Sequence, residues 1–423
     1  MKFLTTGEKV KKLREQLNLT QDDLVAENVT RGLISMIETG RRDISYKTAV
    51  RLAEKFNGKA EELNIILNID EGYLMRSPSE DAEIYCLNKL KNEDITQSTI
   101  DEIWILIKQY DLLEVQAKTY FKFGEIDLEK KNFDKACANY DQAIKIYKSM
   151  GKNEKLGYIY ERMGISKTRD LKYDTAIVYY GLSQYYSFVY DDKATQRLCL
   201  YNLANNYKKT NEIDLALETV EKCLLLCEKK EDIYIYAYNI KAQCYESKGE
   251  YDRAIDIYNL LLEEISDNKN SALGYVYNNL GLNYCHKNDF KESIKCFEMA
   301  ENILNELDKS LLSHTIIEKS HVLLKQKLTV QAVTTVKLGL KYAKEYSDIE
   351  YLLKGNYILA DIYDNLNDTE QLEEIYLKIV DLLKLNKEYN SLKSIYNKLA
   401  IMYLNQDKTD LCKKYLLLSK DLD

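Results

Sequence analysis

The chain has 423 residues, of which 45% are hydrophobic and 30% are charged, a composition typical of a folded globular protein and not of a disordered one. One proline and 15 glycines are too few for a fold rich in tight turns, so helices joined by short connections are expected. The net charge of −8 argues against binding nucleic acid along the whole chain. The absence of a long apolar run or signal core predicts a cytoplasmic location without a membrane partner.

The charge is unevenly distributed. Residues 1–60 contain 12 Lys and Arg against 8 Asp and Glu, a net +4, whereas residues 61–423 contain 48 against 60, a net −12. A small basic head on an acidic body is typical of a DNA-binding domain joined to a module that binds something else.

The head, residues 7–69, has the pattern of five short helices. They are expected at residues 7–18, from residue 21, from residue 31, at 44–56 and at 59–69. Thr20 and Thr30 are suitable N-cap residues for the second and third helices, and Gly40 is a suitable terminator for the third.

The second and third helices are expected to be joined by a tight turn. The stretch "LTQDDL…ISMIETG" resembles the Cro/repressor-type helix-turn-helix domain, with the interval from Leu24 to Ser35 one residue shorter than is usual there. The resemblance implies that Gln21 bonds a phosphate and braces the reading helix, and Arg31 suits a guanine contact. The implied groove-facing set is Thr30, Arg31, Gly32, Leu33 and Ser35, and the implied backbone set is Arg41, Arg42, Tyr46, Lys47 and Thr48. A head that only caps the body or docks a protein is the alternative.

Residues 71–80 are expected to link the head, residues 1–70, to the body, because Pro78 cannot lie inside a continuous helix. Residues 81–114 are expected to form a degenerate helical pair with Trp104 as a core anchor.

The body repeats itself. Two ladders of small or apolar residues run through it, and both step by 40, 40, 38, 39, 39, 40 and 40 residues. The first ladder is Gly124, Gly164, Ala204, Ala242, Gly281, Ser320, Ala360 and Leu399-Ala400. The second ladder is Ala136, Ala176, Ala216, Ala254, Ser293, Ala332, Leu372 and Cys412. Each repeat is expected to form two antiparallel helices that cross closely at the small residues. An aromatic residue, such as Phe133, Tyr173, Tyr251 or Phe290, is expected at the turn between them.

This pattern resembles the tetratricopeptide repeat over residues 115–423, with a period longer than the usual one. The resemblance implies an all-α chain in which the helix-turn-helix bundle is followed by a right-handed superhelical solenoid of about eight or nine repeats. The first helix of each pair would line a concave groove.

A repressor-type head followed by such repeats resembles the RRNPP group of bacterial peptide-pheromone receptors, and in particular its NprR/PlcR branch. The resemblance implies a transcription regulator that binds double-stranded DNA, forms a homodimer or a tetramer, and is switched by a short peptide in the groove. Two alternatives remain. One is a phosphatase or sequestering protein for a response regulator, with Gln116, Glu125 and Glu129 among many candidate residues. The other is a phage or plasmid repressor.

Peptide backbones need donors and acceptors, which carboxamides supply together. With the first small residue of each repeat at its eighth position, the fifth and ninth positions are expected to face the groove. The carboxamide candidates are Asn202, Asn205, Asn239, Gln243, Asn278, Asn279 and Asn397. Apolar walls are expected from Tyr201, Tyr236, Tyr275 and Tyr357, and a carboxylate could be held by Arg162, Lys208 and Lys209. Because the whole chain is rich in Asn, Lys and Tyr, a chance alignment is the competing interpretation.

No metal, cofactor or enzymatic activity is expected. The nine cysteines include no CxxC pair, and only Cys223 and Cys227 are one helical turn apart. The chain also lacks phosphate-loop, dinucleotide-binding and HExxH motifs.

Overall fold

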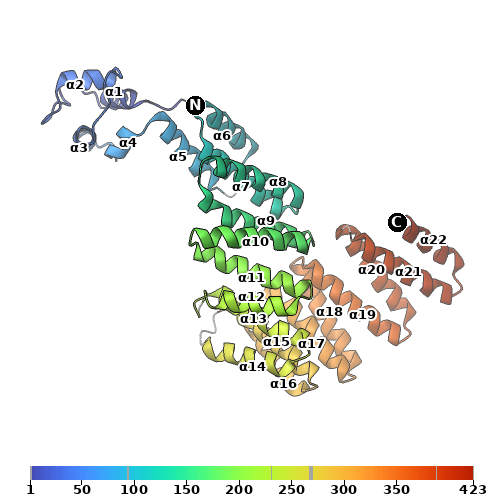
Figure 1. The fold of residues 1–423 in the computed structure, drawn as a ribbon. Coiled ribbons are helices and arrows are strands. Elements are labelled where there is room, and N and C mark those ends of the chain that lie inside the picture. The colour runs from blue at the N-terminus through green and yellow to red at the C-terminus, as the bar shows by residue number, and fades with distance from the viewer. Residues whose placement is uncertain (1, 93–94, 230, 266–269, 387, 423) are drawn as a thin grey trace. The chain divides into compact units, whose positions relative to one another are not determined.

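The computed structural model describes residues 2–92, 95–229, 231–265, 270–386 and 388–422. Within these ranges the chain is helical, and no strand forms apart from an isolated bridge between Ala26 and Val29, so the predicted all-α class is confirmed (Figure 1). The chain divides into two compact units, residues 1–195 and 196–423. In the same ranges no helix is both long and apolar enough to cross a membrane.

The head contains four helices that enclose a small core. They are α1 (Thr6–Gln16), α2 (Arg31–Glu38), α3 (Tyr46–Glu62) and α4 (Glu71–Met75). The predicted Thr30 cap is present, since the Thr30 hydroxyl accepts a hydrogen bond from the Leu33 N–H at 3.2 Å. Gly40 follows α2 at φ +69°, a left-handed conformation that glycine adopts without strain.

Two details of the head differ from expectation. The helix expected from Gln21 is only a single turn, although Thr20 does cap it. The Thr20 hydroxyl accepts a hydrogen bond from the Asp23 N–H at 3.3 Å, and the Thr20 N–H and hydroxyl both lie 2.7 Å from an Asp23 carboxylate oxygen. The chain then reverses at Asn28, at φ 63°, so the shortened interval leaves no room for a longer helix. The continuous helix α3 replaces most of the helix expected at 44–56 and only the first four residues of the one expected at 59–69, because Gly58 weakens a helix without breaking it. The rest of the second expected helix is wrong, since α3 ends at Glu62 and residues 65–69 are not helical.

The segment expected as a linker, residues 71–80, is largely helical. It contains α4 and the start of α5 (Pro78–Leu90), where Ser77 forms a capping box and Pro78 is the first helical residue. Buried Lys9 donates to the carbonyls of Tyr73 and Arg76 at 2.9 and 2.7 Å and pairs with Asp81 at 2.5 Å. The segment before the proline is therefore attached to α1 through its backbone, and the segment after it through the Asp81 side chain.

The remaining helices form antiparallel pairs. Unit 1 contains α5 with α6 (Gln97–Tyr110), α7 (Leu113–Glu129) with α8 (Phe133–Ser149), and α9 (Leu156–Arg169) with α10 (Tyr173–Val189). Helix α11 (Lys193–Lys209) begins in the last three residues of unit 1 and lies mainly in unit 2, where it pairs with α12 (Ile213–Leu224). Unit 2 also contains α13 (Asp232–Ser247) with α14 (Tyr251–Glu264), α15 (Ala272–His286) with α16 (Phe290–Leu307), α17 (Leu312–Lys325) with α18 (Thr329–Glu345), α19 (Ile349–Asn365) with α20 (Thr369–Asn386), and α21 (Tyr389–Asn405) with α22 (Thr409–Lys420). Short 3₁₀ segments precede α9 (Asn153–Lys155) and α17 (Lys309–Leu311). In the first pair Trp104 is only half-buried, and Ile103, Leu106 and Ile107 supply the core instead.

The small residues of the repeats lie where the two helices of a pair cross. A Cβ atom on Gly164 would be 2.4 Å from the ring of Tyr180, and one on Gly124 would be 2.4 Å from the ring of Tyr140. Both tyrosine rings are buried. The glycines therefore make room for the rings, which explains why a small residue recurs once in each repeat.

In the eight pairs from α7–α8 to α21–α22, the second helix begins two residues after a residue with positive φ. These residues are Lys131, Leu171, Asn211, Gly249, Asn288, Lys327, Asn367 and Asp407. Phe133, Tyr173, Tyr251 and Phe290 are accordingly the first residues of α8, α10, α14 and α16, as the repeat pattern predicts.

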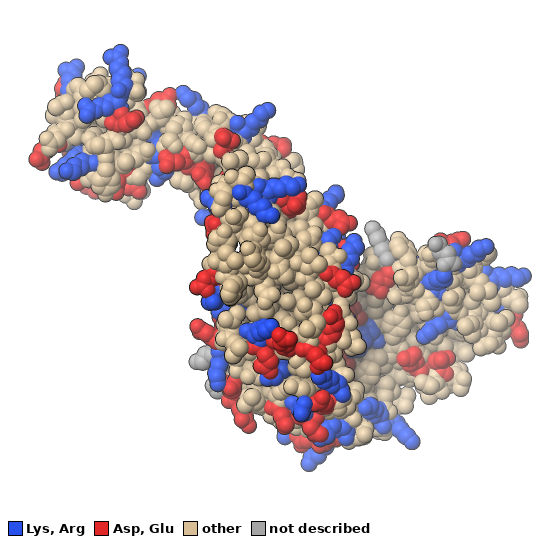
Figure 2. Space-filling view, viewed as in Figure 1, with Lys and Arg blue, Asp and Glu red and all other residues tan. Residues whose placement is uncertain are grey.

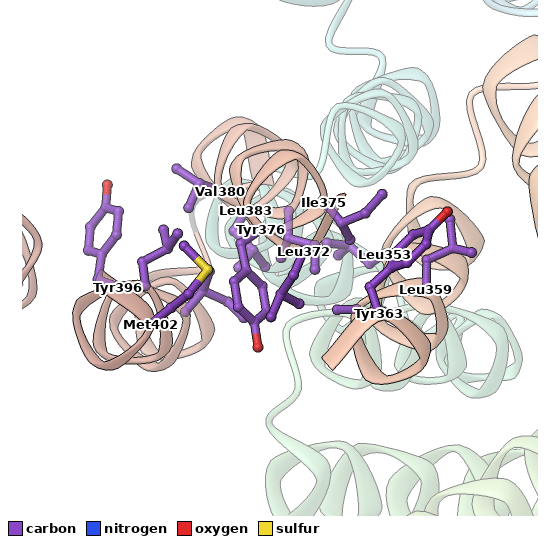
Figure 3. Packing of buried hydrophobic residues seen from close by; sticks show 14 of the residues in the cluster. Leu353, Leu359, Tyr363, Leu372, Ile375, Tyr376, Val380, Leu383, Tyr396 and Met402 are labelled. Carbon is purple, nitrogen blue, oxygen red and sulfur yellow. The ribbon is translucent and has the colours of Figure 1, made fainter. Parts of the chain in front are cut away.

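The core runs on from one pair to the next. Figure 3 shows this for the last repeats, where Leu372 and Tyr376 of α20 lie between Tyr363 of α19 and Met402 of α21. Because each of these pairs shares its core with its neighbours, none of them buries its apolar face alone.

Candidate functional site

Helix α2, the predicted reading helix, is fixed on its inner side by a buried carboxylate. Glu38 accepts hydrogen bonds from the Arg14 guanidinium at 2.7 and 3.2 Å and from the Gln21 amide at 2.8 Å. Its side chain is 5% exposed. The backbone of α2 also lies against Gly7, where an added Cβ would be 2.3 Å from the Ile37 carbonyl oxygen. Gln21 therefore braces α2 through Glu38.

Most of the predicted DNA-contacting residues are exposed on or beside α2. This exposed set is Thr30, Arg31, Gly32, Arg41, Arg42, Tyr46 and Lys47, with Ser35 half-exposed. Arg31 makes only a surface ion pair with Asp22 at 3.3 Å, which is readily exchanged for another anion. Nothing lies within 4 Å of the position a Cβ would take on Gly32.

Two members of the predicted set are not presented in this way. Leu33 is half-buried against the core of the head. Thr48 is buried, and its hydroxyl lies 2.8 Å from that of Ser45, the N-cap of α3. Sequence reasoning also missed Met36, an exposed apolar side chain on α2. Its position four residues after Gly32, a member of the predicted groove-facing set, would have placed it on the same face of the helix.

In unit 1 the predicted carboxylate receptor Arg162 is already paired. Its guanidinium donates to both oxygens of Glu125 at 2.8 and 2.7 Å, and the same carboxylate accepts a hydrogen bond from the Tyr140 hydroxyl. This fork is the strongest geometry for an Arg–carboxylate pair. Glu125, a candidate for orienting water in the phosphatase alternative, is thus occupied by two donors.

In unit 2 several predicted residues bond one another across successive first helices. Asn279 of α15 donates to the Asn239 carboxamide oxygen of α13 at 2.7 Å, and the Tyr258 hydroxyl donates to the same oxygen at 2.9 Å. Lys208 of α11 donates to the Gln243 carboxamide of α13. Burial lowers the pKa of Lys208.

Asn278 lies beside this network and is buried. Its amide is 3.4 Å from the Asn279 side-chain oxygen, and its own side-chain oxygen has no hydrogen-bond partner among the described residues. A buried acceptor without a donor is costly, so this oxygen is a position where a bound donor would stabilise the fold.

A row of aromatic rings also crosses these helices. Tyr201 and Tyr236 have ring centroids 6.2 Å apart, Tyr275 and His314 are 6.1 Å apart, and His314 stacks on Tyr351 at 3.7 Å. Burial raises the pKa of Tyr275 to about 12, so its hydroxyl stays protonated at neutral pH. His314 and Tyr351 were not predicted, although His314 lies six residues before Ser320, the same repeat position that Tyr236 and Tyr275 occupy before Ala242 and Gly281.

A buried carboxylate and a half-buried one were also missed. Glu318 of α17 bonds Lys354 and Tyr351 of α19, and its side chain is 6% exposed. Glu246 of α13 accepts a hydrogen bond from Asn283 of α15 at 3.3 Å, and burial raises its pKa. The repeat spacing would not have indicated either residue, because glutamate is common on exposed helix faces.

The remaining predicted residues are more scattered. Asn202, Asn205 and Lys209 lie on α11, with Asn205 half-buried. Tyr357 packs against the core of the last repeats, and Asn397 is exposed on α21.

The cysteine pair behaves as part of the core. The sulfur atoms of Cys223 and Cys227 are 3.9 Å apart, and burial raises the pKa of both thiols. Across the described ranges no three His, Cys, Asp or Glu side chains come together as a metal site.

Comparison with known proteins identifies the domains of the chain. Residues 7–64 match the helix-turn-helix domain family. Residues 199–230, 235–268 and 353–382 match the tetratricopeptide repeat, and residues 117–153 match the SHNi-TPR family. No curated protein matches the chain by sequence.

Two solved structures share the fold. The apo form of RapI has 16% sequence identity and a TM-score of 0.51, with 81% of this chain and 97% of that one covered. The apo form of the quorum sensor NprR from B. thuringiensis has 17% identity and a TM-score of 0.51, with 81% of this chain and 98% of that one covered. The chain thus consists of a helix-turn-helix domain followed by tetratricopeptide-like repeats, as its sequence predicts, and it shares its fold with these two structures.

Proposed function

We propose that this chain is a DNA-binding transcription regulator whose repeats bind a short signalling peptide. The observation that carries the proposal is the reading helix α2, which is anchored from behind by Glu38 and presents Arg31, Gly32 and Ser35 outward. Rigid support of the contact residues is what a groove-reading helix requires.

Cationic side chains flank this helix at both ends. Arg31 begins α2, Arg41 and Arg42 follow its last turn, and Lys47 lies in the first turn of α3. In the proposed complex Arg31 faces base edges and the other three contact phosphates, where the N-terminus of α3 also favours anions. Met36 is placed to contact a thymine methyl group.

The DNA-binding half is tested by fluorescence anisotropy of the full chain with fragments selected from random duplexes. Arg41→Ala/Arg42→Ala is expected to weaken binding on all sequences and to flatten its salt dependence, because phosphate contacts release counterions. Arg31→Ala is expected to relax preference at one base pair, a loss of about tenfold. Lys55→Ala/Lys59→Ala removes two charges near the other end of α3 and is the matched control. Unchanged binding by all three variants would refute this orientation of the head.

The peptide half rests on the row of side chains across α11, α13 and α15. Tyr201, Tyr236 and Tyr275 offer ring faces, and the carboxamides beside them offer both donors and acceptors. The contacts Lys208–Gln243 and Asn239–Asn279 hold several of these groups in place, so they act as supports, while the Asn278 oxygen accepts from the ligand. This arrangement suits an extended peptide backbone.

Synthetic peptides encoded by short reading frames next to the gene are the probes, with binding measured by calorimetry. Asn278→Ala and Tyr275→Ala are expected to weaken binding by tenfold or more, roughly the loss of one good hydrogen bond or one aromatic wall. Asn259→Ala, on the exposed side of α14, is the control. Equal peptide binding by Asn278→Ala and Asn259→Ala would refute the row of side chains on α11, α13 and α15 as the peptide-binding site.

Action on a response regulator is the second candidate function for this fold. It is tested by loss of phosphoryl label from a phosphorylated response regulator mixed with the full chain. Label loss that is absent from Gln116→Ala would favour this function over pure DNA regulation.

A further inference from the structure

The outer face of α10 differs from the outer faces of the other second helices. Among its 17 residues, "YDTAIVYYGLSQYYSFV", only Asp174 is charged. Figure 2 shows the result as a broad area over α10 with few charged side chains. By contrast, α8 carries the exposed ion pair Asp141–Lys145 at 2.6 Å, and α12 carries Glu218–Lys222 at 2.7 Å.

The apolar side chains of α10 form one continuous stripe. Val178, Leu182, Tyr185 and Val189 follow one another at intervals of three or four residues, and Phe188 lies beside them. All five are exposed, Phe188 at 75% and Tyr185 at 62%. A stripe with this spacing is the surface that one helix buries against another.

Gly181 lies in the middle of the stripe. Glycine lowers helix stability relative to alanine, and at most glycines of these repeats a close internal neighbour offsets that cost. At Gly181 nothing lies within 4 Å of the Cβ position, so no contact inside the protein requires a glycine. An external helix that crosses closely at this point would require one.

We propose that the α10 stripe is a homodimer interface, in which α10 packs antiparallel to α10 of a second copy across a two-fold axis near Gly181. The occupant is a second copy because a stripe without charges is complementary to itself, whereas a charged surface would need a partner of opposite pattern. The exposed apolar side chains of α10 and of Leu171 and Tyr190 beside it supply on the order of 700 Å² per copy, close to the roughly 800 Å² per partner of a standard interface. This interface lies outside the head and does not depend on whether the head binds DNA.

Sedimentation equilibrium of the full chain tests the proposal. The wild type is expected to be a dimer at micromolar concentration, and Tyr185→Glu/Phe188→Glu a monomer, because two carboxylates from each copy would be buried without partners. Both side chains are exposed, so the variant should keep its circular dichroism spectrum and its unfolding midpoint. Leu225→Glu is the matched control: it adds a charge at an 85% exposed leucine outside the stripe and should leave the dimer intact.

Gly181→Leu provides a second, uncharged variant. It fits a single copy, where the Cβ position is open, but would hold two helices apart, so the dimer dissociation constant is expected to rise by at least about tenfold. A monomeric wild type, or a Tyr185→Glu/Phe188→Glu variant that dimerises as the wild type does, would overturn the proposal. DNA binding lost in a chain that still dimerises would instead count against the proposed function alone.

Discussion

A single buried carboxylate links three segments of the head at the residue scale. Glu38 lies in the last turn of α2 and accepts hydrogen bonds from Arg14 of α1 and from Gln21 of the turn before α2. Because both donors are tied to one acceptor, the orientation of α2 depends on a residue that faces away from the proposed DNA.

Glu38→Ala should therefore weaken DNA binding, although Glu38 does not contact DNA in the proposed complex. It leaves Arg14, which is 16% exposed, without its partner, so the head is expected to lose about 2–4 kcal/mol of stability. DNA affinity should fall with it. Glu15 also lies near Arg14, at 3.7 Å, but its side chain is 57% exposed, so Glu15→Ala should change either quantity little. Urea unfolding measures the stability of the head, and anisotropy titrations measure its DNA affinity. Equal effects of Glu38→Ala and Glu15→Ala would contradict the role of Glu38 in bracing α2.

The repeat glycines give a second prediction for single residues. Gly164→Ala places a methyl group 2.4 Å from the buried Tyr180 ring, so overpacking is expected to cost about 1–3 kcal/mol. Gly58→Ala, in α3 where the Cβ position is open, should instead be neutral or stabilising by up to about 1 kcal/mol. Thermal unfolding of the two variants should shift in opposite directions.

Glu246 predicts a dependence of stability on pH. Burial raises its pKa above the usual value of 4.5, so the folded state holds this proton more tightly than the unfolded state does. The stabilisation is complete below the unfolded pKa and is lost as pH rises through the folded pKa. Glu246→Gln should thus stabilise the chain at pH 7 and match the wild type at pH 4. Glu263→Gln, at a carboxylate on the far side of α14, should show no such difference, and identical pH profiles for both variants would refute the assignment.

At the scale of elements, the turn inside each of the eight pairs from α7–α8 to α21–α22 follows one rule. A residue with positive φ ends the first helix, and the second helix begins two residues later. Asn, Asp and Gly occupy five of these eight positions, since they tolerate the left-handed region, and Lys131, Leu171 and Lys327 are the exceptions.

Exchanging residues at these turns should change stability in a predictable direction. Lys131 has φ 60°, so Lys131→Gly is expected to stabilise the α7–α8 pair by roughly 0.5–1 kcal/mol. Gly249 has φ +75°, and Gly249→Lys should destabilise the α13–α14 pair by a similar or larger amount. Positions 131 and 249 are both exposed, so the unfolding midpoints report the backbone effect alone. Shifts of the same sign in the two variants would contradict this effect.

The elements themselves were largely predictable from local pattern. The two ladders of small residues located every helix pair from α7 to α22, because close helix crossings demand small residues at fixed intervals. The single turn after Thr20 was not predictable, because its cap residues are the same as those of a longer helix and only the reversal at Asn28 ends it. The continuous α3 was missed for the opposite reason, since packing of Phe56 and Ala60 into the head core carries the helix through Gly58.

At the scale of the whole molecule, the proposed dimer predicts how DNA should be bound. Two heads in one particle should bind a duplex with two half-sites at least about tenfold more tightly than a duplex with one, because the second contact is then intramolecular. Tyr185→Glu/Phe188→Glu should remove this advantage and leave single-site binding unchanged. The measurement is a pair of anisotropy titrations at one salt concentration. An advantage that persists in the variant would mean that the heads are joined by another surface.

The sequence by itself determined the class of the fold, the order of head and repeats, and the position of helix α2, since all of these follow from periodic spacing and local capping along the chain. Only the tertiary structure decided how the polar side chains are used. Arg162 is paired with Glu125, Asn239 with Asn279, and Thr48 is buried beside Ser45. The partner of a carboxamide or guanidinium lies on another helix about 35 to 40 residues away, so the choice among neighbours of similar chemistry is made by packing and not by spacing.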